Sequence, residues 1–227
     1  MAILHHHPLD PFSRRVRLSL GELGLVPDLI EEKPGPARPE LLELNPAGTV
    51  PVLFDDDGTT LCGAYAITEY LDELYGASRS LLGVDAASRA ETRRLVSWFD
   101  EKFNSEVTLP IVGEKAIGRF LPAEFGGGSP DMGRVRAGIA SLRAHLHVIG
   151  ELTDARNWLA GDDLSAADLA AAAHLSCIDF LGDVPWHESP RAKEWYQRIK
   201  SRPSFRPLLS DHVRGILPPA AYADLDF

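Results

Sequence analysis

The sequence has little cysteine, no long apolar run and no excess of positive charge. Its 227 residues contain two cysteines, Cys62 and Cys177, which excludes a disulfide framework or a cysteine-rich zinc site and indicates a reducing, cytoplasmic compartment. No segment reaches the about 18 consecutive apolar residues of a membrane-spanning helix, so we expect no membrane insertion. The formal net charge of −10 argues against nucleic-acid binding through a general positive field.

The composition is that of a globular protein with a core, since 44% of residues are hydrophobic and 25% are charged. Apolar periodicity in the first third predicts strands and helices in alternation. The expected order is strand, helix, strand, hairpin and helix, over residues 2–7, 12–25, 26–33, 48–63 and 64–76. We expect Gly76 to end the last of these helices.

Strand signals nearly vanish after residue 80, and helical spacing replaces them. Leu95, Phe99 and Phe103 recur at the i, i+4, i+8 spacing of one helix face. The expected helices span residues 86–107, 130–153, 164–181 and 189–205, with a glycine-rich break at 121–131. The pattern predicts three parts, an α/β domain over 1–78, an all-helical domain over 87–210 and a tail over 211–227.

Two local motifs have a physical interpretation of their own. Pro51 stands where a loop meets a strand, which tolerates a missing N–H, and the pattern leaves the isomer of the Val50–Pro51 bond open. Ser165 is followed three residues later by Asp168 and then by an apolar run. That spacing predicts a capping box, so we expect Asp168 to serve the helix start rather than chemistry.

Four segments together resemble a known family. They are "PFSRRVRLSLGELGL", "NPAGTVPVL", "AITEYLDELY" and "LSAADLAAAAHL", in the order and spacing of glutathione S-transferases. The resemblance covers essentially the whole chain. It implies a thioredoxin-like N-terminal domain, an all-α C-terminal helical bundle, a homodimer and a glutathione cleft with Val50 and Pro51 at its edge.

The sequence departs from that family where glutathione would be held. The position of the activating serine or cysteine is Asp10, whose carboxylate would repel a thiolate and raise the pKa of the thiol. The resemblance also implies an acidic residue and a serine at positions 63 and 64, which here are Gly63 and Ala64. Ser13 and Cys62 remain as degenerate catalytic candidates, and Cys62 could be activated by the following helix N-terminus.

Other segments are similar to an alphaproteobacterial branch of the family. They are "RRLVSWFDEKF", "HLSCIDFLGDVPW", "WYQRIKSRPSFRPLL" and "YADLDF". In that branch a transferase-fold protein binds filaments of the division protein FtsZ. The resemblance implies a cell-division protein at the division site, with FtsZ filaments as partner and no cofactor. The alternative is a glutathione-dependent transferase or reductase with an unusual site.

The candidate partner contacts are two arginines and the tail. Arg136 and Arg143 are seven residues apart on one predicted helix; such a pair usually marks a solvated face, but two acidic partners need local cationic contacts. The tail either docks on the partner or folds back to cap the helical domain. Its candidate contacts are Tyr222, Asp224, Asp226 and Phe227.

The histidines have a structural interpretation. His5, His6 and His7 alternate along one predicted strand, so that only His5 and His7 share a face. Two neighbouring ligands are too few for a metal site, and hydrogen bonding explains them better. We expect His174, on an apolar helix, to be a core histidine and no metal to be bound.

Overall fold

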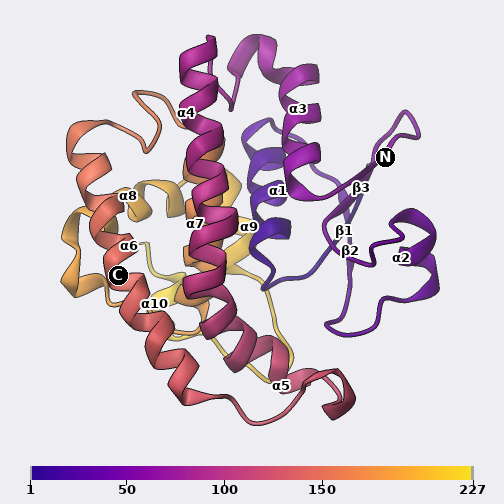
Figure 1. Cartoon of the computed structure of the whole chain (residues 1–227). Helices are drawn as coiled ribbons and strands as arrows, with labels where there is room; N and C mark the ends of the chain where they lie inside the picture. Colours follow the sequence, from indigo (N-terminus) through magenta and orange to yellow (C-terminus); the bar gives the residue numbers. More distant parts are fainter. Residues whose placement is uncertain (1, 226–227) are drawn as a thin grey trace.

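The structure is a computed structural model that describes residues 2–225, except for the side chain of Ser78. Its N-terminal third is a four-stranded sheet covered by helices (Figure 1). The elements in chain order are β1 (Ile3–His6), α1 (Pro11–Glu22), β2 (Asp28–Glu31), α2 (Pro39–Leu44), β3 (Val52–Phe54), β4 (Thr60–Cys62) and α3 (Ala64–Arg79). The predicted α/β class and element order are confirmed.

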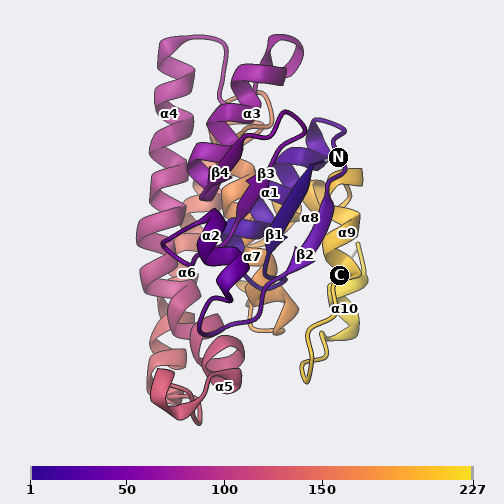
Figure 2. The same ribbon diagram turned by 90° about the vertical axis from the view of Figure 1, so that its right-hand side faces the viewer.

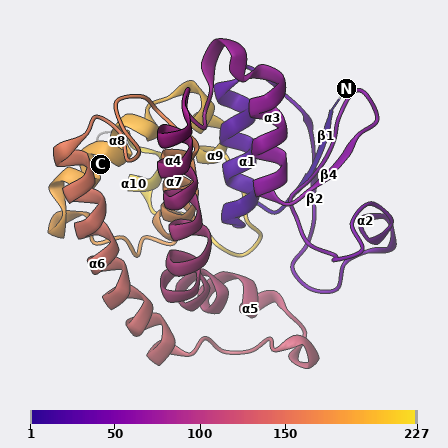
Figure 3. The same cartoon turned by 45° about the horizontal axis from the view of Figure 1, so that its top comes forward.

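The sheet has the strand order β2-β1-β3-β4. β1 pairs parallel with β2, while β3 runs antiparallel to both β1 and β4. Leu4 lies opposite Leu53 in this register, and both pack with Val16 and Leu20 of α1 and Ile67 of α3. Helices α1 and α3 lie on the sheet face toward the helical domain, and α2 lies on the other face (Figures 2 and 3).

Helix α1 begins at Pro11 because Asp10 caps it and proline suits the first helical position. It ends at Glu22 rather than at the expected Leu25. Gly24 follows with φ +74°, a left-handed conformation that glycine adopts freely and that stops the helix.

The prediction for Gly76 is wrong, because α3 continues through it to Arg79. The helix ends where the Asp72 carboxylate accepts hydrogen bonds from the Ser80 hydroxyl and the Leu81 backbone N–H, both at Oδ1 (2.8 and 2.7 Å). Gly76 lies against that carboxylate, and a Cβ there would be 3.1 Å from it. Gly76 therefore leaves space for the Asp72 carboxylate, which holds the turn that follows α3.

The remainder of the chain is helical, as predicted. Its elements are α4 (Ala86–Ser97), the wider π-type helix η1 (Trp98–Ile117), α5 (Gly118–Phe120), η2 (Ala123–Phe125), α6 (Met132–Ala155), α7 (Ala166–Phe180), η3 (Trp186–Glu188), α8 (Pro190–Lys200), η4 (Pro203–Phe205), α9 (Arg206–Leu209) and α10 (Ala220–Ala223). α4 runs directly into η1, so this rod is longer than the expected 86–107. Across residues 2–225, no helix is long and apolar enough to cross a membrane.

Helix α7 is buried along its whole length at the centre of the bundle. Asp168 accepts hydrogen bonds from the backbone N–H of Ser165 (3.0 Å), the backbone N–H of Leu159 (2.9 Å) and the indole of Trp195 (2.9 Å). The structural role predicted for Asp168 at the start of this helix agrees with these bonds. One buried carboxylate thus joins the start of α7 to the preceding loop and to α8.

Three arginines of α1 join the two halves of the molecule. Arg15 donates to Asp100 of η1 (2.5 Å), and Arg17 donates to both carboxylate oxygens of Asp211 (2.8 Å each). Arg14 is fully buried and donates to the hydroxyl groups of Ser176 (2.8 Å) and Tyr222 (3.1 Å). Buried, hydrogen-bonded guanidinium groups of this kind fix the relative position of the parts they join.

Candidate functional site

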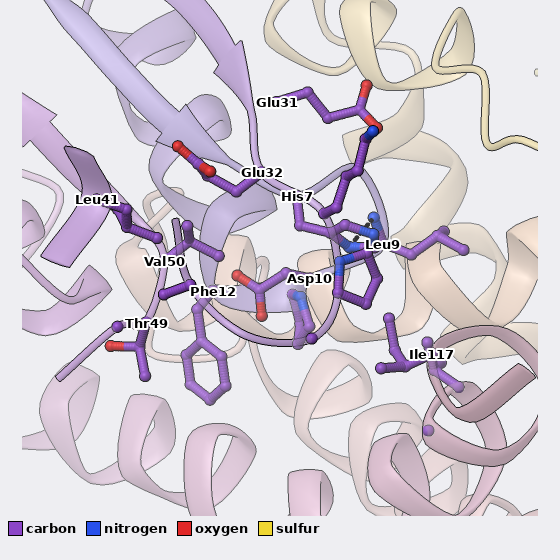
Figure 4. Close-up of a pocket in the computed structure, with 18 of the residues that line it drawn as sticks. His7, Leu9, Asp10, Phe12, Glu31, Glu32, Leu41, Thr49, Val50 and Ile117 are labelled. Carbon is purple, nitrogen blue, oxygen red and sulfur yellow. Dashed lines mark hydrogen bonds between the residues drawn. The ribbon is translucent and has the colours of Figure 1, made fainter. Parts of the chain in front are cut away.

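A cavity of about 780 Å³ lies where the N-terminal sheet domain meets η1. The turn after β1 forms its floor, the segment after β2 forms one side, and η1 forms the opposite side. Figure 4 shows the labelled side chains converging on this space. Its lining includes the predicted cleft residue Val50 together with His7, Asp10, Phe12, Thr108 and Val112. The cavity thus includes Val50, as the resemblance implies, and the binding of glutathione there stays a prediction.

Asp10 is held in the cleft by Ser13. The backbone N–H and the hydroxyl of Ser13 both donate to Asp10 Oδ2, at 2.7 and 2.6 Å. Figure 4 shows the carboxyl group of Asp10 pointing toward Phe12 and Val50. Burial raises the pKa of Asp10 to about 6, although the hydrogen bonds from Ser13 oppose that shift. At neutral pH this site therefore offers a negative charge, which does not stabilise a thiolate.

The Val50–Pro51 peptide bond is cis, which decides the isomer that the sequence left open. The loop before it is ordered by Asn45, whose side-chain amide donates to the backbone carbonyl of Thr49 (2.9 Å) and whose side-chain oxygen accepts from the Ala47 N–H (3.1 Å). Val50 lines the cavity and Pro51 is buried behind it.

The other degenerate catalytic candidates do not reach the cavity. Ser13 is fully buried, and its hydroxyl is occupied by Asp10 and by the backbone N–H of His7 (3.3 Å). Cys62 is exposed at the end of β4, outside the cavity lining. Burial of its sulfur raises the pKa of the Cys62 thiol, so the activation considered from its position before a helix is not found. Gly63 and Ala64 also lie outside the lining.

A charged group in the cleft was missed by the sequence analysis. Glu32 accepts from His5 Nδ1 (2.7 Å) and from Arg38 (2.7 Å), and both Glu32 and Arg38 line the cavity. The signal was present in the charged run "EEK" at the end of β2, but only the fold brings Arg38 back to Glu32.

His5, His7 and His174 form hydrogen bonds with neighbouring groups of the fold. His5 is bonded to Glu32, and His7 Nδ1 accepts the backbone N–H of Leu9 (3.2 Å). Burial lowers the pKa of both His6 and His7 to about 4. His174 is buried, with its Nδ1 2.8 Å from the Thr108 hydroxyl. Among residues 2–225 no group of three or more histidine, cysteine or acidic side chains could hold a metal ion.

The two candidate partner arginines lie on the outer surface of α6. Arg143 is 49% exposed and donates to both oxygens of Glu188, at 3.0 and 2.7 Å. Arg136 is also exposed. The structure thus leaves both side chains accessible, and their role in binding stays a prediction.

The tail folds back, which corrects the expectation that Tyr222 meets a partner. The Tyr222 side chain is 1% exposed, its hydroxyl donates to the Leu208 carbonyl (3.1 Å), and its ring packs edge-on against Phe180. The side chain fills the core because Arg14 supplies a buried partner for its hydroxyl. Asp224 is exposed after α10, whereas Asp226 and Phe227 lie outside the described residues.

The fold and the cleft define a class of protein. The sequence matches the glutathione S-transferase N-terminal domain over residues 4–79 and the glutathione S-transferase C-terminal domain over residues 140–203. The chain belongs to the glutathione S-transferase family.

Particular relatives are similar over the whole chain. The "FtsZ-localized protein A" of Caulobacter vibrioides is 47% identical over 227 residues, which cover 99% of this chain and 97% of that protein. The structure of "FzlA from C. crescentus" is 46% identical, with a TM-score of 0.94 over 100% of this chain and 99% of that one. The crystal structure of a glutathione S-transferase from Rhodospirillum rubrum F11 is 50% identical, with a TM-score of 0.94 and full coverage of both chains.

Proposed function

We propose that this protein is a cell-division protein that binds FtsZ filaments at the division site and promotes constriction without glutathione chemistry. The observation that carries the proposal is the 47% identity, over nearly the full length of both proteins, to a relative named for its localisation with FtsZ. The chemistry of the cleft supports it, because the position that would activate a thiol holds the carboxylate of Asp10.

The proposed mechanism is binding to a polymer by a twofold dimer. A homodimer presents the same surface twice, and two linked surfaces raise the apparent affinity for a repeating filament. We place the contact on the outer face of α6, with Arg136 and Arg143, and on the end of the tail from Asp224 onward. Exposed arginines there would offset the repulsion that a net charge of −10 creates toward an acidic filament.

Co-sedimentation with GTP-assembled FtsZ tests the proposal. The wild-type protein should pellet with the filaments, and Arg143→Glu should reduce the bound fraction. Arg94→Glu is the matched control, since Arg94 is 52% exposed and is likewise paired with one glutamate, Glu91. Size-exclusion chromatography on both variants shows whether the dimer persists. No pelleting of the wild type, or equal loss in both variants with dimers intact, contradicts the proposed contact.

The tail needs a separate variant because Tyr222 belongs to the core. A chain that ends after Ala223 keeps Tyr222 and removes the exposed Asp224 together with the residues that follow it. It should still fold, and it should bind filaments less well. Unchanged filament binding would remove the tail end from the proposed contact.

A second function is favoured by the presence of the cleft between the sheet domain and η1. The chain would then be a glutathione-dependent transferase or reductase with glutathione as cofactor. Calorimetric titration with glutathione, followed by an assay of conjugation to a thiol-reactive electrophile, separates the two. Saturable binding together with conjugation supports the enzyme.

A further inference from the structure

The inner wall of the cleft combines apolar side chains with one carboxyl group. Leu9, Phe12, Val50 and Val112 line the cavity around Asp10. Figure 4 shows the Asp10 carboxyl pointing into the space between these walls. The hydrogen bonds from Ser13 both end on Oδ2. Apolar walls with a small number of placed polar groups are typical of small-molecule sites.

The charges that line the rest of the cavity largely cancel. Glu32 and Arg38 form a bonded pair (2.7 Å) that also involves His5. Glu31 and Lys33 are neighbours on the exposed rim. Three carboxylates and two cations therefore line the cavity, which leaves a net charge of −1 that lies on Asp10.

Groups packed behind Asp10 compensate its charge only in part, since Arg15 lowers the pKa of Asp10 but is shared with a second carboxylate. Arg15, from the same helix, is bonded to Asp100 of η1 (2.5 Å). Burial lowers the pKa of His7 to about 4 and also lowers the pKa of His174 on α7, so both rings are uncharged at neutral pH. Cys177 is buried, and burial raises the pKa of its thiol to about 12.

We propose that this cavity binds a small molecule that carries an ammonium group on an aromatic or aliphatic body, with the ammonium group held by Asp10. A cation beside the half-buried carboxylate of Asp10 forms an ion pair in a partly desolvated site, where the attraction is stronger than in water. The faces of Phe12 and the aliphatic walls accommodate the apolar body, and an aromatic ring next to a cation adds further attraction. A thiolate or carboxylate ligand meets repulsion at the same position.

The proposal is independent of filament binding, since the cavity lies in the cleft and the proposed FtsZ contact lies on α6 and the tail. The volume of about 780 Å³ falls within the range of about 300–1,000 Å³ that ligand pockets occupy. A two-ring amine with a short linker is therefore a suitable probe.

The experiment compares three indole compounds of nearly equal shape by isothermal titration calorimetry at pH 7.5. Tryptamine carries a positive charge, tryptophol is neutral and indole-3-propionate is negative. We expect tryptamine to bind about tenfold or more tightly than tryptophol, a difference of about 1.4 kcal/mol, and indole-3-propionate to bind weakest. Equal affinities, or a preference for the anion, overturn the proposal.

Variants locate the interaction at Asp10. Asp10→Asn should abolish the preference for tryptamine over tryptophol, whereas the control Glu31→Gln, on the exposed rim, should retain it. If Asp10→Asn does not fold, the pH profile of the wild type replaces it. Because burial raises the pKa of Asp10 to about 6, the affinity for tryptamine should fall as the pH drops through 6. A preference kept in folded Asp10→Asn, or a flat profile between pH 7.5 and 5, contradicts the assignment.

Discussion

The hydroxyl of Ser13 donates to the carboxylate of Asp10 at 2.6 Å while it accepts the backbone N–H of His7 at 3.3 Å. The Ser13 hydroxyl therefore stabilises the carboxylate of Asp10 and is not available to a bound substrate. Asp10 caps the N-terminus of α1 and also lines the cleft. The same carboxylate thus has a structural and a ligand-facing role.

Ser13→Ala should destabilise the protein more at pH 8 than at pH 5. A hydrogen bond to an ionised group contributes about 1.5–3 kcal/mol, and this one lowers the pKa of Asp10 against the effect of burial. Its contribution is present above the Asp10 pKa of about 6 and is reduced when the carboxyl group is protonated below it. Urea unfolding at both pH values measures the difference, and an equal cost at both would contradict the role given to the Ser13 hydroxyl.

His6→Leu should make the protein less sensitive to acid. Burial, with a smaller contribution from Arg17, lowers the pKa of His6 from 6.5 to about 4. As the pH falls from 6.5 to 4, the unfolded chain takes up a proton that the folded state does not, so the folded state loses up to about 3 kcal/mol through this residue. Unfolding free energies at pH 7.5 and 4.5 should differ less in His6→Leu than in the wild type. His147→Leu, on an exposed side chain, should leave the difference unchanged.

Asp168→Ala should cost about 3 kcal/mol or more, because it leaves the buried donors on Ser165, Leu159 and Trp195 without their acceptor. Thermal and urea unfolding measure the effect. Asp163→Ala, on an exposed residue of the preceding loop, is the control and should change stability by less than about 0.5 kcal/mol. A similar small change in both variants would show that Asp168 is not needed at the start of α7.

Tyr222→Phe should lower the free energy of unfolding by about 1–2 kcal/mol, because the Leu208 carbonyl and the Arg14 guanidinium each lose a hydrogen-bond partner. Tyr222→Ala should cost about 3–5 kcal/mol, since it also removes a buried ring. Chemical denaturation with a fluorescence readout distinguishes the two. If Tyr222→Ala is as stable as the wild type, the tail is not part of the core.

The two cysteines should differ in reactivity without either behaving as an activated nucleophile. Burial raises the pKa of the Cys62 thiol and raises the pKa of Cys177 to about 12. A disulfide reagent at pH 7.5 should therefore modify exposed Cys62 slowly and Cys177 only after unfolding. Cys62→Ala should leave one thiol that reacts only in denaturant. If native Cys62 reacts faster than free cysteine, its thiol is activated and Cys62 is a candidate nucleophile after all.

The sequence by itself determined the order of strands and helices, the role of Asp168 at the start of α7 and the family. The order of elements and the role of Asp168 depend on local spacing, on capping residues and on apolar periodicity, which act within about ten residues of one another. The family was evident from the resemblance of four sequence segments to glutathione S-transferases. The helix end at Gly76 was wrong because a carboxylate of the same helix, Asp72, caps the chain beyond it. A glycine in a sequence does not reveal whether it stops a helix or makes room for a neighbour.

Tertiary structure alone decided the character of the cleft and the path of the tail. The cis bond at Pro51, the pairing of Arg38 with Glu32 and the raised pKa of Asp10 all depend on surroundings assembled from separate segments. Tyr222 turns inward because Arg14, 208 residues away in sequence, offers its hydroxyl a buried partner. Burial and long-range pairing set the charge state and exposure of a side chain, and neither quantity is a property of the residue type.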